Sequence, residues 1–333
     1  MRICICGGGS LGIVCAGVFA SQGHCVNILT GHPTSWSNRI SVFDIYGKKY
    51  EGDLSLITDN PQDAVYKCDI ILLCVPGYLI EKILTDIKSY LLKDVVIGSI
   101  VSSSGFFFIA HDILGSQFSL FGFQRVPFIS RVREYGSTGD LLGYKESLNV
   151  AIENTSNPEN IRQILEKLFV TPIKLLDNYY EASLTNSNPI LHTGRLYSMW
   201  KDYNGEIYSK QSLFYYDWTD DASEILIAMD KEFMRLLNHL QIREGAIPSL
   251  LEYYESIDAS SLTKKIKSIQ AFKGILTPMK EVSGGWIPDF NSRYFKEDFP
   301  FGLYFIKHLA SQHDVPTPTI DKIYEWGISK TFI

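Results

Sequence analysis

The chain begins with a short apolar run that leads directly into a glycine-rich turn. Residues 2–6 (RICIC) have the pattern of a buried strand, Gly7, Gly9 and Gly12 follow as G-x-G-x-x-G, and a helical stretch covers 13–21. In such a unit the first glycine permits a tight turn, the second lets the backbone approach a pyrophosphate, and the third lets the helix pack on the strand. Free N–H groups at the helix start then face the phosphates. The sequence therefore predicts a dinucleotide site, with a glycine-rich turn of another α/β protein as the alternative.

Alternation of strands and helices continues to about residue 177. The run at 69–75 is apolar throughout, as expected for a parallel strand buried on both faces. Residues 40–57 alternate around Gly47, which predicts a hairpin inserted in the sheet. We predict an α/β fold with a doubly wound parallel sheet, a Rossmann domain, over residues 1–177. Its other expected strands are 25–30, 95–100, 118–123, 147–152 and 172–176, and its other helices are 61–67, 80–92 and 158–168.

The pattern becomes helical after residue 177, which predicts a second, all-helical domain over 178–333. Apolar residues recur at helical spacing between 220 and 240, as in the core of a helix bundle rather than a cofactor site. The expected helices are 220–240, 247–256, 262–272, 301–312 and 319–329.

Composition narrows the class of function. The net charge is −6, and Lys and Arg do not concentrate on one segment, so we expect no nucleic-acid partner. Apolar runs stay below the ~20 residues that span a bilayer, and the first strand leaves no room for a signal peptide, so we expect no membrane partner. All six cysteines lie within the first 74 residues, without zinc-type pairing. They fit buried thiols in the cytoplasm, with no metal site. A homodimer is compatible with the sequence.

The end of the second predicted strand leaves the cofactor open. This position normally holds an acid for the ribose of NAD or an Arg for the 2′-phosphate of NADP. Here Thr30, His32 and Ser35 can serve either cofactor, and the nearest cation is Arg39. We expect NADPH or NADH, with the missing acid favouring NADPH slightly. The cofactor-binding candidates are Gly7, Gly9, Ser10, Leu11, Gly12, Thr30, Val75, Pro76 and Arg293.

Two polar segments of the second domain are candidates for acid–base chemistry. His192 comes three residues after Asn188-Pro189, and Asp298 lies in the polar stretch 288–302. An imidazole positioned by a carboxylate exchanges a proton near neutral pH, as hydride-transfer enzymes require. Two structural interpretations compete with this one. His192 can be a hydrogen-bonded core histidine, and Asp298 can cap a helix that begins at Pro300.

Several motifs together resemble the octopine/nopaline (opine) dehydrogenase family over nearly the whole chain. They include Gly-Gly-Gly at the first turn, Asn-Pro-x-x-His at 188–192 and Arg-Tyr-x-x-Glu-Asp-x-Pro-x-Gly at 293–302. Further matches lie at 105–106, 112–115, 127–136, 251–254, 273–278 and 284–290. The resemblance implies a helical second domain of the 6-phosphogluconate-dehydrogenase-like type. It also implies an NADH- or NADPH-dependent reductive condensation of an amino acid with a 2-oxo acid.

The resemblance also implies roles for residues of both domains. His192 is expected to be the catalytic histidine and Asp298 its carboxylate partner, while Asn188, Gln124 and Arg125 are expected to bind substrate. Arg293 can bind a phosphate or carboxylate across the cleft, or pair with Glu297 or Asp289 instead.

Two positions depart from the family pattern. Thr193 stands where relatives usually have Pro, which can alter the helix start. Gln124 stands where octopine-type members look acidic, so arginine is not the first amino substrate to expect. The rival functions are a ketopantoate-reductase-like or 2-hydroxy-acid dehydrogenase and a non-catalytic dinucleotide sensor. The reductases typically use a lysine as the acid and consume no amine.

Overall fold

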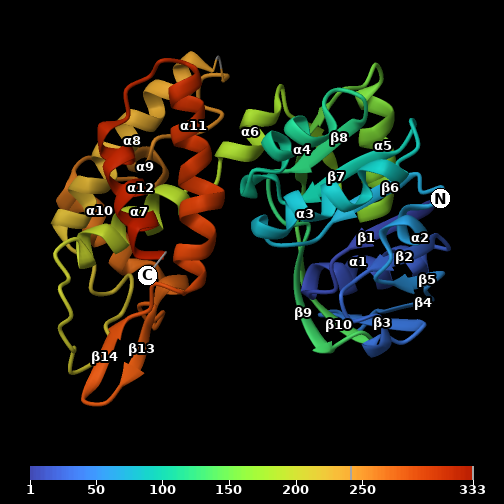
Figure 1. The fold of residues 1–333 in the computed structure, drawn as a ribbon, viewed down its shortest axis with the longest axis horizontal. Coiled ribbons are helices and arrows are strands. Elements are labelled where there is room, and N and C mark those ends of the chain that lie inside the picture. Colours follow the sequence, from blue (N-terminus) through green and yellow to red (C-terminus); the bar gives the residue numbers. More distant parts are fainter. Residues whose placement is uncertain (241, 332–333) are drawn as a thin grey trace. The chain divides into compact units, whose positions relative to one another are not determined.

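The computed structural model describes residues 1–240 and 242–331. The chain divides into two compact units, Met1–Thr185 and Asn186–Ile333 (Figure 1). This division falls later than the expected boundary at 177, because helix α6 (Tyr179–Leu184) packs on strands β8 and β11 and on helix α4 of the first unit.

An eight-stranded sheet forms the centre of the first unit. Its strand order is β12-β11-β8-β7-β6-β1-β2-β5, and its pairs are parallel except for β11 against β8. Alternate residues of β1 enter different cores: Ile3 and Ile5 join the core with helices α1 and α5, whereas Cys4 and Cys6 join the core with α2, α3, α4 and α6. Helices on both faces confirm the predicted doubly wound α/β fold. The sheet strands are β1 (Arg2–Cys6), β2 (Cys25–Leu29), β5 (Leu56–Thr58), β6 (Ile70–Leu73), β7 (Val96–Ile100), β8 (Ser119–Phe123), β11 (Leu148–Glu153) and β12 (Ile173–Leu175), and the other helices are α1 (Ser10–Ser21), α2 (Pro61–Val65), α3 (Gly77–Ile87), α4 (Phe106–Leu114) and α5 (Pro158–Phe169).

A second sheet of four strands was not expected from the sequence. Its order is β4-β3-β10-β9, with bounds β3 (Arg39–Asp44), β4 (Lys49–Asp53), β9 (Phe128–Glu134) and β10 (Thr138–Tyr144). The predicted hairpin at 40–57 therefore exists as β3 and β4, but its placement in the main sheet was wrong. Only the short strand β5 of that segment joins the main sheet.

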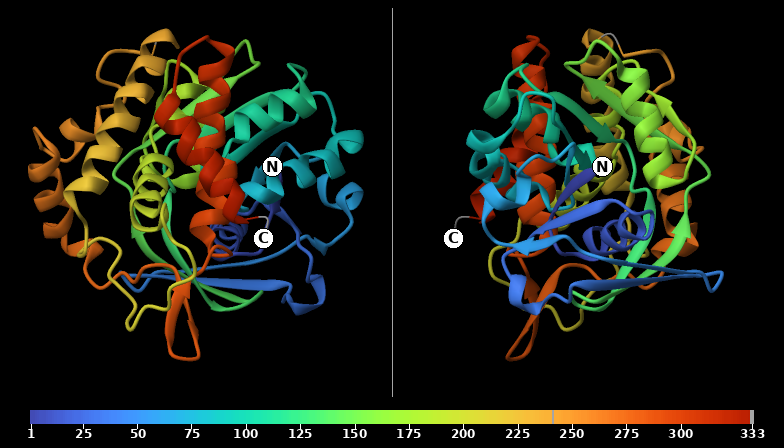
Figure 2. Two further views of the ribbon diagram at one scale, coloured as in Figure 1. Left: turned by 60° about the vertical axis from the view of Figure 1, so that its left-hand side comes forward. Right: turned by 90° about the vertical axis from the view of Figure 1, so that its right-hand side faces the viewer.

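Helix α1 explains why the second sheet is there. Every residue from Gly12 to Ala20 is buried, so the helix has no solvated face. It packs on the main sheet and also on all four strands of the second sheet (Figures 1 and 2). Small residues permit the approach: a Cβ at Gly17 would lie 2.5 Å from Val42 Cγ2, and one at Gly52 would lie 2.6 Å from Ala20 Cβ. A helix that is apolar all round needs two covering layers.

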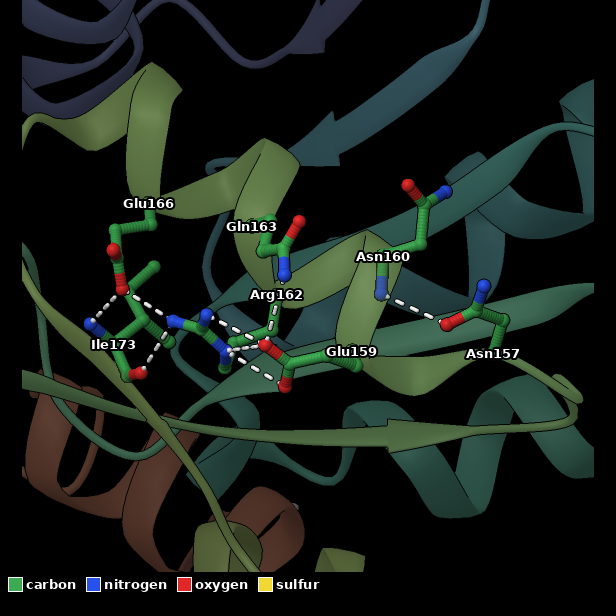
Figure 3. A network of polar contacts seen from close by, with 7 residues as sticks. All are labelled: Asn157, Glu159, Asn160, Arg162, Gln163, Glu166 and Ile173. Carbon is green, nitrogen blue, oxygen red and sulfur yellow. Dashed lines mark hydrogen bonds and ion pairs between the residues drawn. The ribbon is translucent and has the colours of Figure 1, made fainter.

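Polar contacts fix helix α5 on the sheet edge (Figure 3). The Asn157 side chain accepts from Asn160 N at 3.1 Å and caps the helix start. Arg162 forms ion pairs with Glu159 and Glu166 and donates to Ile173 O of β12 at 3.0 Å. Glu166 in turn accepts from Ile173 N at 3.0 Å. Both backbone groups of Ile173 are therefore bound by side chains of the preceding helix.

The second unit is mainly helical, which agrees with the predicted class. Its α-helices are α7 (Asn188–Trp200), α8 (Asp220–His239), α9 (Leu250–Tyr253), α10 (Ala259–Ser268), α11 (Tyr304–Gln312) and α12 (Pro318–Thr331). Two details differ from the expectation. The unit also holds a hairpin, β13 (Met279–Val282) with β14 (Gly285–Pro288), visible at one end of the helices in Figure 1. Pro300 does not start a helix but lies inside the π-helix η5 (Tyr294–Leu303), which kinks at Phe301.

No helix within the described residues is both long and apolar enough to cross a membrane.

Candidate active site

The glycine turn between β1 and α1 has the geometry that a dinucleotide site needs. Gly7 has φ +110°, and its Cβ would lie 2.7 Å from Cys74 O and Val75 Cγ1. A Cβ at Gly12 would lie 2.0 Å from Gly7 O, so the helix can follow the turn only with glycine here. Gly9 differs from both, because its φ of −78° suits any residue and its Cβ side is empty for 4 Å. The glycine at position 9 is therefore not explained by backbone strain. The open space beside it fits a bound ligand instead.

The remaining cofactor candidates of the first unit lie at the same edge of the main sheet. Ser10 and Leu11 form the first turn of α1, whose N-terminus receives no side-chain cap. Thr30 follows β2 and is buried. Val75 and Pro76 follow β6, with Pro76 at the N-cap of α3. The carboxyl ends of β1, β2 and β6 thus bring these side chains together, as parallel strands with this order must.

A histidine and a carboxylate that are 106 residues apart meet in the second unit. His192 Nδ1 lies 2.8 Å from Asp298 Oδ2. Both side chains are mostly buried, with exposed fractions of 11% and 18%. A carboxylate only accepts, so Nδ1 carries the hydrogen and Nε2 of the neutral ring is an acceptor. Nε2 lies 2.9 Å from the Tyr215 hydroxyl, which donates to it.

Two unusual pieces of backbone produce this contact. His192 lies one turn into α7, where Pro189 occupies the first turn without needing a backbone donor. Asp298 and Tyr294 come from the π-helix η5, and the Tyr294 ring packs edge-on against the imidazole at 4.8 Å. The two segments touch directly, since a Cβ at Gly302 would lie 2.7 Å from Pro189 Cγ. π-Helical segments are rare and often occur at functional sites.

Comparison with known proteins shows which proteins this chain is similar to. Residues 175–330 match the model described as NAD/NADP octopine/nopaline dehydrogenase, alpha-helical domain, and residues 3–102 match ketopantoate reductase PanE/ApbA. The octopine dehydrogenase of Mizuhopecten yessoensis is 28% identical, covering 99% of this chain and 90% of the relative. A solved octopine dehydrogenase structure with NADH and L-arginine has a TM-score of 0.86 at 26% identity, covering 99% of this chain and 89% of that one.

The helical domain of the chain is similar to the octopine/nopaline dehydrogenase family.

A tauropine dehydrogenase of Arabella iricolor is 27% identical to this chain, covering 97% of this chain and 89% of the relative. The predicted resemblance is thereby confirmed. The two family motifs that carry it, Asn188-Pro189 and Pro300-x-Gly302, are the segments that meet through Pro189 and Gly302. Their close packing gives a physical reason for both motifs, because it sets Asp298 against His192.

Tyr215 was missed by sequence reasoning. It lies in the aromatic run 213–218, which has no motif that distinguishes it. Buried Arg195 of α7 donates to Phe214 O at 3.2 Å and to Asp217 O at 2.7 Å, and so fixes this run. Burial lowers the pKa of Arg195 to about 10. The Tyr215 ring stacks on Phe272 at 4.0 Å, and burial raises the pKa of Tyr215. Its hydroxyl therefore stays protonated and can donate to His192.

The substrate candidates are distributed over both units of the chain. Asn188 precedes His192 by one helical turn on α7 and is half-buried. Gln124 follows β8 and is held by its neighbours: its amide donates to Thr185 Oγ1 at 2.9 Å and accepts from Asn149 Nδ2 at 3.0 Å. Arg125 is exposed. Thr193, the departure from the family pattern, continues α7 and donates to Pro189 O.

Arg293 forms one of the ion pairs expected as alternatives for it. Its guanidinium binds both carboxylate oxygens of Glu297, each at 3.0 Å, and remains 84% exposed. This contact is compatible with anion binding by Arg293, which stays a prediction. The described residues include no cluster of three or more His, Cys, Asp and Glu side chains that could hold a metal.

Proposed function

We propose that this chain is an NADH- or NADPH-dependent opine dehydrogenase, which condenses an amino acid reductively with a 2-oxo acid. The observation that carries the proposal is the contact of His192 with Asp298, because it lies in the domain that matches the family model. Relatives named octopine and tauropine dehydrogenase span nearly the whole chain, which supports the same reaction class.

The residues of the first unit fit a dinucleotide. The open space at Gly9 and the uncapped start of α1 suit a pyrophosphate, since backbone N–H groups at a helix start bind anions. Gly7, Ser10, Leu11, Gly12, Thr30, Val75 and Pro76 would hold it there. When bound, the nicotinamide supplies the hydride that reduces the condensed substrate.

His192 is the residue that we assign to proton transfer. Asp298 accepts from Nδ1–H, fixes the ring and stabilises its charged form, so that Nε2 is the nitrogen that gives or takes a proton. In the reductive direction Nε2–H donates its proton to the substrate oxygen or nitrogen. The Tyr215 hydroxyl holds Nε2 in position at 2.9 Å, and the substrate atom takes its place on Nε2 when the proton is transferred. Tyr215 is thus a positioning residue in this proposal.

The amino substrate is named only by class. A solved relative contains L-arginine. Gln124 is neutral, and its amide is already bound by Thr185 and Asn149. The neutral amide of Gln124 binds a guanidinium more weakly than a carboxylate at this position would bind it. We therefore infer that the amino acid is one without a cationic side chain.

Cofactor oxidation in the presence of pyruvate tests the proposal. We expect oxidation to require an amino acid in addition to the 2-oxo acid. His192→Ala should lower kcat by about 10²–10⁴-fold, because positioned proton transfer is lost, and Asp298→Asn should also impair turnover. The exposed His308 of α11 provides a control, and His308→Ala should keep wild-type kinetics. Near-normal activity of His192→Ala would instead identify His192 as a core histidine.

A ketopantoate-reductase-like activity is the second candidate, because residues 3–102 match that family model. Oxidation with the 2-oxo acid alone, at the rate seen with amino acids present, would establish it. Binding of cofactor without any turnover would indicate a dinucleotide sensor.

Location and assembly are further parts of the proposal. All six cysteines are free thiols, which supports a cytoplasmic location. A homodimer is proposed from the sequence alone, and light scattering after size-exclusion chromatography tests it.

A further inference from the structure

A buried indole of the first unit has an N–H group without a partner. Trp36 is 8% exposed, and its Nε1 has no hydrogen-bond acceptor among the described residues. Leaving a buried donor unpaired costs about 1–3 kcal/mol, so such groups call for an explanation. The segment before Trp36 follows β2, where the ribose of a dinucleotide is bound in this fold.

The indole lies against the dinucleotide loop. A Cβ at Gly8 would be 2.8 Å from Trp36 Cζ2, 3.0 Å from the Tyr135 hydroxyl and 3.3 Å from Thr30 Oγ1. One ring carbon separates Cζ2 from Nε1, so the edge of the indole that faces Gly8 is the edge with the N–H group. Any side chain at Gly8 would occupy the space between these three polar groups. The G-x-G-x-x-G motif allows any residue at position 8. The lack of room for a side chain there explains why it is glycine.

Contacts between two loops fix this arrangement. Ser37 N donates to Gly136 O at 2.9 Å, and a Cβ at Gly136 would lie 2.2 Å from Ser35 O. The rings of Trp36 and Tyr135 meet edge to face at 5.9 Å. The turn between β9 and β10 is therefore part of the site, although it comes from the second sheet.

We propose that Trp36, with Thr30 and Tyr135, forms the subsite for the adenosine ribose, a proposal that rests on the dinucleotide site of the proposed function. Trp36 Nε1 donates to a ribose oxygen, and the two hydroxyls contact the same sugar. All three groups are neutral. Two arginines of the adjoining strands already pair with carboxylates, Arg39 with Glu51 and Asp53, and Arg133 with Asp140.

This subsite favours NADH over NADPH. A 2′-phosphate needs a cation, whereas a 2′-hydroxyl needs only neutral partners. The slight preference for NADPH expected from the missing acid is reversed, because the buried indole takes the place that the acid has in other NAD enzymes.

Calorimetric titration with NADH and with NADPH tests the subsite without any turnover. Wild type should bind NADH at least about tenfold more tightly than NADPH. Trp36→Phe and Tyr135→Phe should each weaken NADH binding by about 3- to 10-fold, the value of one hydrogen bond. Trp326→Phe is the matched control, since Trp326 Nε1 is also unpaired among the described residues but lies on α12 of the second unit.

Two variants are needed because a substitution of Trp36 can also lower the stability of the fold. Trp36→Phe removes ring volume, so its thermal unfolding must be compared with wild type, whereas Tyr135→Phe removes only a hydroxyl, which lies 3.4 Å from Thr30 Oγ1. NADH binding within twofold of wild type in both variants overturns the subsite. Equal affinities of wild type for NADH and NADPH overturn the selectivity. Opine formation is measured separately, so its absence refutes the proposed function while the binding data still decide the subsite.

Discussion

At the scale of single residues, the surroundings of each glycine in the first turn show what that glycine is needed for. Gly7 is required by its positive φ, Gly12 by the carbonyl at 2.0 Å from its would-be Cβ, and Gly8 by the polar groups around it. Gly9 alone has neither strain nor neighbours. Within six residues, the turn thus has glycines required by conformation or packing and one, Gly9, that we propose lies against a ligand. Substitutions can distinguish these roles.

Gly12→Ala and Gly9→Ala form a matched pair. Gly12→Ala should lower the midpoint of thermal unfolding and also weaken NADH binding, because α1 must move away from the turn. Gly9→Ala should unfold like wild type yet bind NADH at least about tenfold more weakly. Thermal unfolding and calorimetric titration of both variants measure the two effects. If Gly9→Ala binds NADH with wild-type affinity, the pyrophosphate does not lie against Gly9.

Asp230 predicts a pH dependence of stability. Burial raises its pKa to about 6, although the carboxylate accepts from Leu250 N at 2.9 Å. The folded state therefore holds this proton more tightly than the unfolded chain, whose value is about 3.9. As the pH rises from about 4 to 6, the unfolded state releases the proton first, so this contribution to stability is lost.

Asp230→Asn should remove that loss and keep an acceptor for Leu250 N. At pH 7 the variant should be more stable than wild type by up to about 3 kcal/mol, with no such gain at pH 4. Urea unfolding at both pH values measures the difference. An equal effect at the two values would show that Asp230 does not titrate in this range.

At the scale of helices and strands, hydrophobic periodicity predicted the main sheet but not the second one. Strands β9 and β10 were missed because Gly139 and Gly143 interrupt β10. These glycines have a packing role, since a Cβ at Gly139 would lie 3.1 Å from Ile13 Cγ2 of α1. Alternation of Arg131 and Arg133 with apolar residues was the one available signal for β9.

The candidate site was predictable only in part. The glycine turn follows a local spacing rule, so the sequence alone located it. His192 and Asp298 were paired through the family resemblance, because no spacing rule relates residues that are 106 positions apart. Tyr215 and Trp36 had no signal, since their roles depend on contacts with Nε2 of His192 and with Gly8.

The start of helix α12 is stabilised by a side chain from another helix. Buried Glu232 of α8 accepts from Thr319 N at 2.9 Å and from Ile320 N at 2.9 Å. Glu232→Ala should cost about 1–3 kcal/mol in the free energy of unfolding, because one buried and one partly buried N–H group lose their acceptor. Glu224→Ala, on an exposed position of the same helix, should be nearly neutral. Urea unfolding compares them, and similar losses would contradict the capping role.

At the scale of the whole molecule, the chain consists of two units with separate hydrophobic cores. The described core clusters of the first unit include no residue beyond Ala182. That residue belongs to α6, and Tyr179 of the same helix packs on Phe107 at 5.2 Å. Gln124 donates to Glu181 O at 3.1 Å as well. The first unit is therefore complete only when α6 is included.

Two fragments test this boundary. Residues 1–185 should fold alone, unfold cooperatively and bind NADH, but show no turnover because His192 is absent. Residues 1–177 should be less stable and more prone to aggregate, since removal of α6 exposes the aromatic side chains beneath it. Circular dichroism during heating and calorimetric titration with NADH compare them. If the two fragments are equally stable, α6 does not belong to the first unit, and the domain boundary lies at 177.

The double covering of helix α1 has a consequence for biosynthesis. The ribosome completes α1 at Ser21, whereas β9 and β10, which cover its second face, end only at Tyr144. At about 5–20 residues per second, the roughly 120 residues between them take on the order of 6–25 s to be made. During this interval the nascent chain presents an apolar helix that has only the β3–β4 hairpin available as an outer cover. Residues 10–53 of the nascent chain therefore keep an apolar face of α1 uncovered until β9 and β10 have been made.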